Sequence, residues 1–489
     1  MGSIVLSGSP LRAPSSYGPR TGPLVLSGGA FGRGSMDDVR IALSGTLLAL
    51  AAVALVVAER RSGYFGPTPS GPWLVSAVLV GGVLAAAAAV ILPGGLRRTG
   101  LLVVGGAALL GLAGLVTAPT TSTDSARYAW DGIVAGHGTS PYAHVPAADD
   151  LAGWRPSWLF PAGPCPGGRF VTGAGVPSGD PLCTALNRVG VPTIYPPFAQ
   201  GFFTLVRALV PVSARFLPFQ VAGLVLVVAV TAVLVVAMRR RGTDPRWAAC
   251  WGWSPFVVLE AVNNAHVDVL GCLAGVLGTL VLAVGGRRRR TVLGGILLGL
   301  AVVTKFVPAL LVPPLLRRRP VTLLVSIAAT VGLSYVPYVV WTGRGVLGFL
   351  PGYLSEEGYD SGRRFVLLGF LSGGAATTVA LLLLALAAVL AWRLADPDRP
   401  WTAQTVLTGS VLLIVSPTYP WYSLLLVPGL ALSRRPEWLL VPLALEARVF
   451  SPDRWPTVVL VAAVLVLVAS LLRARRRPLA PHRTLEVVS

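Results

Sequence analysis

The sequence predicts an all-α polytopic membrane protein. Of its 489 residues 54% are hydrophobic and only 12% are charged, and the mean hydropathy is +0.71. Uncharged apolar runs such as 221–238, 321–341 and 377–392 are close to the roughly 20 residues that a helix needs to cross a bilayer. A soluble protein could not enclose so many near-spanning segments in one core, so this alternative is excluded.

The apolar segments predict about 12 to 14 transmembrane helices within one domain, residues 36–472. Several segments are shorter than a full span, and short or broken helices are tolerated where they line a protein cavity rather than lipid. The segment 198–210 follows Pro196 and Pro197 and is expected to be interfacial or re-entrant.

The net charge of +20 is distributed as arginine clusters between the apolar segments. This distribution follows the positive-inside rule. A basic recognition element with interleaved aromatic residues is missing, so nucleic-acid binding is not expected. With the clusters inside, loop 119–195 is extracytoplasmic in a multi-pass cell-membrane protein, although the pair Arg60-Arg61 falls on the outer side. The clusters are 97–98, 239–241, 287–290, 317–319, 434–435 and 473–477.

The two ends of the chain and the long loop have different compositions. Residues 1–35 are rich in glycine, serine and proline and predict a disordered cytoplasmic tail, and residues 473–489 predict a basic cytoplasmic tail. Loop 119–195 contains Cys165 and Cys183, which could form a disulfide if the loop is exported. Two unpaired thiols are the alternative.

The segment 124–142 contains the first group of candidate catalytic residues. On a helix that begins at Asp124, positions i, i+4 and i+7 share one face, and these positions are Asp124, Tyr128 and Asp131. Arg127 and Trp130 lie beside that face. Two carboxylates, a cation and aromatic rings at a membrane edge indicate chemistry on an amphipathic substrate.

Lys305 is the second candidate, because it is the only lysine among 40 lysine and arginine residues. It lies in apolar sequence near the expected outer end of a short helix. A lysine ammonium is a compact charge that suits phosphate oxygens, so pairing with phosphate or with a carboxylate is favoured. A side chain that merely reaches toward the interface is the alternative, but arginine would serve equally well there.

The turn 260–268, Glu-Ala-Val-Asn-Asn-Ala-His-Val-Asp, is the third candidate. Glu260, His266 and Asp268 could orient a substrate, bind a metal or cap the hairpin. Two aromatic motifs are weaker, because interfacial aromatic residues are common. They are 192–198, which contains Tyr195, and 416–422, which contains Trp421 and Tyr422. The acidic loop 356–360 could be solvated or could bind a ligand.

Taken in order, these motifs resemble the glycosyltransferase-C superfamily, and in particular the actinobacterial polyprenyl-phosphate-mannose-dependent mannosyltransferases of the family-87 type. The resemblance covers roughly residues 40–472, with one departure at Ile133, where relatives often have arginine. The matching elements are Asp124, Arg127-Tyr128, Trp130-Asp131-Gly132, Gly138–Tyr142, Thr193–Pro197 after Asn187-Arg188, Asn264–Asp268, Lys305–Pro308 and Pro420–Tyr422.

The resemblance implies a glycosyltransferase-C-like helical bundle whose extracytoplasmic loop carries the catalytic acids. It implies inverting transfer of a sugar, expected to be mannose, from a polyprenyl-phosphate donor to a glycan or glycolipid acceptor in cell-envelope synthesis. Asp124 is the expected general base and Asp131 its support, while Lys305 and Arg127 bind the donor phosphate. The expected substrate-binding residues are Tyr128, Trp130, Tyr142, Tyr195, His266, Asp268, Trp421 and Tyr422.

No cofactor is certain, although some members of the superfamily require a divalent cation. The main alternative function is a transporter or flippase of a lipid-linked or anionic substrate. A transporter is expected to place its charged residues near the bilayer midplane between repeated halves, whereas here they gather at one face. A purely structural envelope partner gives no reason for the isolated Lys305.

Overall fold

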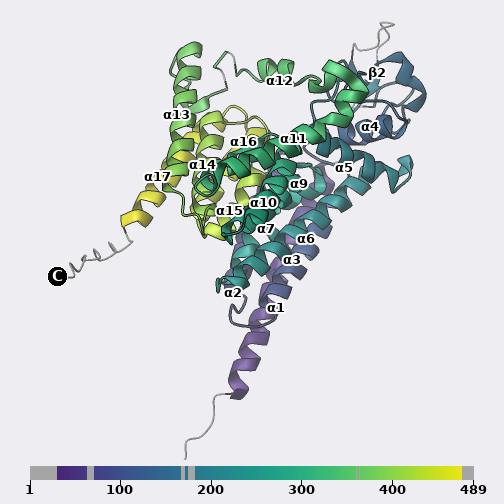
Figure 1. The fold of residues 1–489 in the computed structure, drawn as a ribbon. Coiled ribbons are helices and arrows are strands. Elements are labelled where there is room, and N and C mark those ends of the chain that lie inside the picture. The colour runs from purple at the N-terminus through teal and green to yellow at the C-terminus, as the bar shows by residue number, and fades with distance from the viewer. Residues whose placement is uncertain are drawn as a thin grey trace, which may run out of the picture.

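A computed structural model describes residues 30–62, 71–166, 171–173, 182–359, 361–362 and 364–475. The expected terminal tails, 1–35 and 473–489, therefore lie mostly outside the described residues, as does Asp360 of the acidic loop. The described part is almost entirely helical (Figure 1). This confirms the prediction of an all-α polytopic protein.

The helices are distributed along the whole described chain. The α-helices are α1 (Ala30–Ser62), α2 (Gly71–Ile91), α3 (Thr99–Ala113), α4 (Asp124–Gly136), α5 (Pro197–Ala208), α6 (Leu217–Arg240), α7 (Ala249–Gly252), α8 (Pro255–Val257), α9 (Asp268–Ala283), α10 (Arg288–Val302), α11 (Pro320–Thr342), α12 (Leu350–Glu356), α13 (Gly373–Leu394), α14 (Trp401–Val415), α15 (Leu426–Ser433), α16 (Leu440–Phe450) and α17 (Trp455–Arg475). One antiparallel pair, β1 (Val171–Gly173) and β2 (Leu182–Thr184), lies in the long loop.

Six helical stretches in the described residues are long and apolar enough to cross a membrane. A further stretch is a pair of helices, Pro255–Asn263 and Asp268–Ala283, with a bend of 116° between them. The six stretches are the helices of 18 residues or more, so the expected count of 12 to 14, which included shorter segments, stays a prediction. Prolines and turn residues break several of the shorter segments. In 306–316, for example, the chain forms two short 3-10 turns that begin around Pro308 and Pro313. The six long stretches are Ser35–Ser62, Trp73–Ile91, Leu217–Arg240, Pro320–Glu356, Gly373–Leu394 and Trp455–Arg475.

The largest hydrophobic core lies between α1, α2, α3, α6 and the bent segment before α9. The bend contains a π-helical turn, Val258–Asn263, followed by the turn that leads to His266. Helix α6 approaches this turn so closely that a Cβ added at Gly223 would lie 2.0 Å from the carbonyl oxygen of Ala261. Only glycine fits at that contact. Gly223 therefore allows the turn before His266 to pack directly against the backbone of α6.

The loop 119–195 folds as a small unit with its own core (upper right in Figure 1). Trp130, Leu159 and Phe160 are buried in this core, and a disulfide joins Cys165 to Cys183. Helix α4 packs against α5 at Gly132, where an added Cβ would lie 2.6 Å from the carbonyl oxygen of Phe203. The loop unit is therefore tied to the helical body through α4, whose first residue is Asp124.

Candidate functional site

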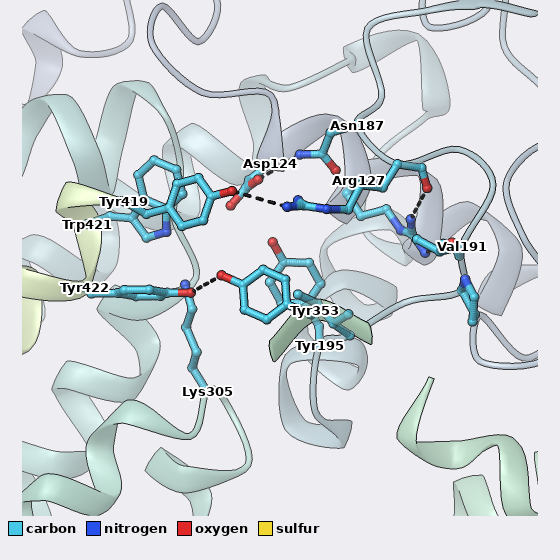
Figure 2. A pocket seen from close by; sticks show the side chains of 13 residues that line it. Asp124, Arg127, Asn187, Val191, Tyr195, Lys305, Tyr353, Tyr419, Trp421 and Tyr422 are labelled. Atoms are coloured by element: carbon cyan, nitrogen blue, oxygen red, sulfur yellow. Dashed lines mark hydrogen bonds between the residues drawn. The ribbon is translucent and has the colours of Figure 1, made fainter. Parts of the chain in front are cut away.

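A polar pocket, here called the Asp124 pocket, lies where the loop unit meets the helical body (Figure 2). Its walls come from the start of α4, the segment after β2, the turn that follows α10, helix α12 and the 3-10 turn after α14. Six of the residues predicted from the sequence contribute to this lining. The lining residues are Asp124, Arg127, Asn187, Arg188, Val191, Pro192, Ile194, Tyr195, Lys305, Tyr353, Tyr419, Trp421 and Tyr422.

Asp124 is the acidic residue that lines the pocket. Its side chain is 14% exposed, and its Oδ1 accepts a hydrogen bond from Asn187 Nδ2 at 3.0 Å. A carboxylate in the first turn of a helix is favourable because the helix dipole is positive there. The backbone N–H of Asp124 donates to Ser122 Oγ at 3.2 Å. Asn187 thus orients the carboxylate, which is still accessible from the pocket.

His266 lies directly behind Asp124 and is fully buried. Its Nε2 is 3.0 Å from Ser122 Oγ and 3.9 Å from Asp124 Oδ2. Its Nδ1 is 2.9 Å from both the carbonyl oxygen and the carboxylate of Glu260. Because both neighbours of Nδ1 are acceptors, we assign a proton to Nδ1, and in that tautomer Nε2 can accept from Ser122 Oγ. His266 therefore contacts Asp124 from behind and is not part of the pocket lining.

Lys305 reaches the pocket from the side opposite α4. Its Nζ donates to Asp268 Oδ2 at 2.8 Å, and the two side chains are only 14% and 8% exposed. The ammonium also lies 4.3 Å from the ring centroid of Tyr422. A lysine has three N–H donors, so the bond to Asp268 leaves Lys305 able to bind an anion in the pocket.

The expected acid pair on α4 is not a pair in space. Asp131 is 1% exposed and does not line the pocket. It accepts from Arg127 Nε at 2.9 Å and from Gln200 Nε2 at 2.9 Å. Seven residues along a helix correspond to a rise of about 10 Å, so sharing a face does not bring Asp131 to Asp124. Asp131 instead holds Arg127 within the protein.

Arg127 lines the pocket, but its hydrogen bonds are made to the protein. Besides Asp131, it donates to the carbonyl oxygens of Arg188 at 3.4 Å and of Val191 at 3.1 Å. The guanidinium therefore fixes the segment after β2 against α4. Lys305 is the better placed of the two predicted phosphate-binding cations.

Three predicted substrate-binding aromatic residues are buried and do not line the Asp124 pocket. Tyr128 is fully buried and stacks on Phe203 at 4.3 Å, and Trp130 is buried against Phe160. Tyr142 is buried and donates its hydroxyl to the carbonyl oxygen of Tyr195. The reason is that α4 is enclosed by α5 on one side and by the loop core on the other, so aromatic residues on both faces are covered.

The pocket also contains residues that the sequence did not single out as site residues. Arg188 forms a bidentate contact with Glu356, with Nη2 at 2.8 Å and Nε at 3.1 Å from Oε1, and donates to Tyr419 Oη at 3.2 Å. Burial alone would lower the pKa of Arg188, but the hydrogen bonds and charges of Glu356 and Tyr419 outweigh burial and raise it. The signal was present in the motif Asn187-Arg188 and in the acidic loop that begins at Glu356.

Aromatic rings form the remaining wall of the pocket (Figure 2). Tyr419 stacks on Trp421 at 4.8 Å, and Trp421 stacks on His266 at 3.9 Å. The hydroxyl of Tyr353, on α12, hydrogen bonds to that of Tyr422 at 2.8 Å. Burial is the main cause that raises the pKa of Tyr419 to about 12, so its hydroxyl stays protonated near neutral pH. Such a wall suits a sugar ring or an isoprenoid chain.

The acidic residues of the site are spread over several hydrogen-bonded partners. Among the described residues, no group of three or more histidine, cysteine, aspartate or glutamate side chains is arranged to hold a metal ion. Asp124, Asp268 and Glu260 each contact a different basic or amide group.

Comparison with known proteins gives a family match for a segment that contains part of this site. Residues 193–417 match the family model of glycosyltransferase family 87. The matched segment contains Tyr195, His266, Asp268 and Lys305, whereas Asp124 precedes it and Trp421 follows it. No curated protein and no solved structure matched the chain. Together with the apolar helices, the family match supports a multi-pass membrane glycosyltransferase, with a sugar donor and a sugar acceptor as substrates.

Proposed function

We propose that the protein transfers a sugar, with mannose as the expected one, from a polyprenyl-phosphate donor to a glycan or glycolipid acceptor. The observation that carries this proposal is that Asp124 and Lys305 line one pocket. One can accept a hydroxyl proton, and the other can neutralise a phosphate. The family match supports sugar transfer, and the membrane-embedded helices suit a donor with a lipid chain.

The proposed reaction is a single inverting displacement. The acceptor hydroxyl oxygen forms a bond to the anomeric carbon while the bond from that carbon to the phosphate oxygen breaks. Asp124 takes the hydroxyl proton as the general base, and Lys305 stabilises the negative charge that grows on the leaving polyprenyl phosphate. A β-linked mannosyl donor therefore gives an α-mannoside.

His266 and Asp268 act in this scheme as positioning residues. His266 is linked to Asp124 through Ser122, and Glu260 fixes the tautomer of His266 from behind. Asp268 holds the ammonium of Lys305 toward the pocket. Each residue that contacts substrate is thus oriented by a buried neighbour, which keeps the base and the cation at a fixed separation.

Substrate entry requires the pocket to widen. Its free volume is about 40 Å³, whereas sites for small molecules have roughly 300–1,000 Å³. Helix α12 lies over the pocket, and its contacts there include the Arg188–Glu356 ion pair, the Tyr353–Tyr422 hydrogen bond and the guanidinium of Arg188 over the ring of Tyr353. We propose that α12 moves outward when donor or acceptor binds.

The proposed location of the pocket is the extracytoplasmic side of the cell membrane. The arginine clusters lie at the other ends of the helices that carry the site, and such clusters face the cytoplasm. A cysteine introduced at Asp150, in the loop unit, should react with an impermeant maleimide in intact cells. A cysteine at Arg288 should react only after lysis, and the reverse pattern would overturn this orientation.

The test of the function is a donor panel. Purified protein is incubated with an acceptor extract and labelled polyprenyl-phosphate mannose, arabinose or glucose, and the product is analysed by mass spectrometry. A covalent α-mannoside from the mannose donor is expected. Transfer from another donor alone would reject mannose, and movement of the lipid across a vesicle without any covalent product would reject transfer in favour of a flippase.

A further inference from the structure

A second, larger cavity lies at the arginine-rich end of the helices. Its volume is about 1240 Å³, and it opens between the ends of α6, α13, α14 and α15. It shares no lining residue with the Asp124 pocket. Helix α14, which has 15 residues, begins at this cavity and ends shortly before Tyr419, so the two sites are separated by roughly 22 Å of helix.

One wall of this cavity is apolar and belongs to membrane-facing helices. Ala387, Leu390 and Leu394 of α13 line it together with Val406 of α14. Leu390 is 46% exposed and Leu394 is 77% exposed. Because α13 is one of the long apolar stretches, this wall continues into a surface that acyl chains cover in a bilayer.

The other wall carries arginines without carboxylate partners. Arg241, Arg399 and Arg434 line the cavity, and in the described ranges no ion pair to an acidic side chain is found for any of them. The cavity also contains three carboxylates. Asp398 pairs with Arg318 and Asp244 pairs with Arg246, so Asp396 is the one carboxylate of the lining that stands against these three arginines. The excess charge at this wall is therefore positive.

Arg241 and Arg399 line the same cavity, where the positive charge of Arg399 acts on Arg241. The guanidinium of Arg241 lies 4.7 Å from the ring centroid of Trp401. Burial lowers the pKa of Arg241, and the positive charge of Arg399 lowers it further. An anion between the two guanidinium groups removes this repulsion, and guanidinium groups bind phosphate through two parallel hydrogen bonds.

We propose that this cavity binds an anionic membrane phospholipid, whose phosphate lies between Arg241 and Arg399 and whose acyl chain lies along Leu390 and Leu394. Charge complementarity and the continuous apolar wall together identify a lipid rather than a free anion. Basic pockets between transmembrane helices are a known way to hold phospholipid headgroups. The lipid links the ends of α6, α13 and α14, and this role is independent of sugar transfer.

The test measures lipid binding to the full-length protein in detergent by native mass spectrometry and by the thermal unfolding midpoint. Phosphatidylglycerol, phosphatidylcholine and inorganic phosphate are the three probes. Phosphatidylglycerol should bind and raise the midpoint, whereas the other two should not. Inorganic phosphate that raises the midpoint equally at the same concentration would overturn the lipid assignment, and so would equal binding of phosphatidylcholine.

A matched pair of double variants separates this site from general charge attraction. R241Q/R399Q removes two positive charges from the cavity, and R288Q/R289Q removes two from an exposed position on α10 outside it. Affinity for phosphatidylglycerol should fall at least tenfold in R241Q/R399Q alone. An equal loss in both variants, or no loss in either, would overturn the proposal.

A third variant keeps all the arginines and tests the apolar wall. Ala387→Trp places a large side chain in the cavity, so it should weaken phosphatidylglycerol binding whether or not R241Q/R399Q folds. Unchanged lipid binding in Ala387→Trp would contradict the proposed path of the acyl chain. Lipid binding and the unfolding midpoint do not depend on turnover of a donor or an acceptor. The tests with these variants therefore remain informative if sugar transfer is not the function.

Discussion

Replacing Lys305 with methionine separates a structural from a functional role of its charge. The ammonium and its partner Asp268 are 14% and 8% exposed and 2.8 Å apart. Breaking such a buried pair leaves an uncompensated carboxylate and costs about 3–5 kcal/mol. If Lys305 also stabilises the leaving phosphate, its removal should slow sugar transfer by about 100- to 1,000-fold, the usual effect of losing one group that stabilises a developing anion.

The double variant K305M/D268N distinguishes the two roles, because it removes both buried charges. Thermal unfolding should show that much of the stability lost in Lys305→Met returns in the double variant. The transfer rate, measured with saturating labelled donor on folded protein, should stay low. D268N alone should retain more activity than either variant that lacks the lysine. Recovery of activity together with stability in the double variant would refute a catalytic role for Lys305.

Three further changes test how the site is built. Asp131→Asn leaves Arg127 without its buried carboxylate and should lower the free energy of unfolding by about 3–5 kcal/mol, measured by thermal or denaturant unfolding; unchanged stability would contradict the pairing. Loss of the Cys165–Cys183 bridge in a double serine variant should cost the loop unit about 3 kcal/mol and speed its limited proteolysis, whereas an unchanged cleavage rate would argue against the bridge. Gly132→Ala should lower the free energy of unfolding by about 1–3 kcal/mol, because the added methyl group overpacks α4 against α5. The control Gly136→Ala should be neutral, because nothing lies within 4 Å of its added Cβ. Equal effects of the two changes would contradict the packing of α4 against α5.

Part of the site follows from residue chemistry that is local in sequence. Lys305 stands out because arginine serves every other cationic position, and it does line the Asp124 pocket. Asp124 stands out as the first acid after an apolar segment, and it also lines the pocket. The turn 260–268 was expected to bring its polar residues to the same region, and His266 and Asp268 do contact Asp124 and Lys305.

The sequence does not show which side of each residue is covered by other parts of the protein. Helical periodicity puts Asp131 on the face of Asp124, but the long-range partner Gln200 comes from α5 and is invisible to that pattern. The sequence predicts Tyr128 and Trp130 at a membrane edge, because they lie in the loop 119–195 just after an apolar segment. Trp130 is buried in the core of that loop, whereas Tyr128 is buried against α5 and α6. Apolar length alone also does not show where prolines divide a segment into short turns, as in 306–316.

The central claim is that Asp124 is the base of a sugar transfer at this pocket, and Asp124→Asn tests it most directly. Asp150→Asn is the matched control, because Asp150 is an acid of the same loop unit. Its side chain is 57% exposed and lies outside the pocket. Single-turnover transfer from labelled polyprenyl-phosphate mannose should fall by about 100-fold or more in Asp124→Asn, with donor binding and the unfolding midpoint unchanged, while the control keeps the normal rate. A normal rate in Asp124→Asn would contradict the account.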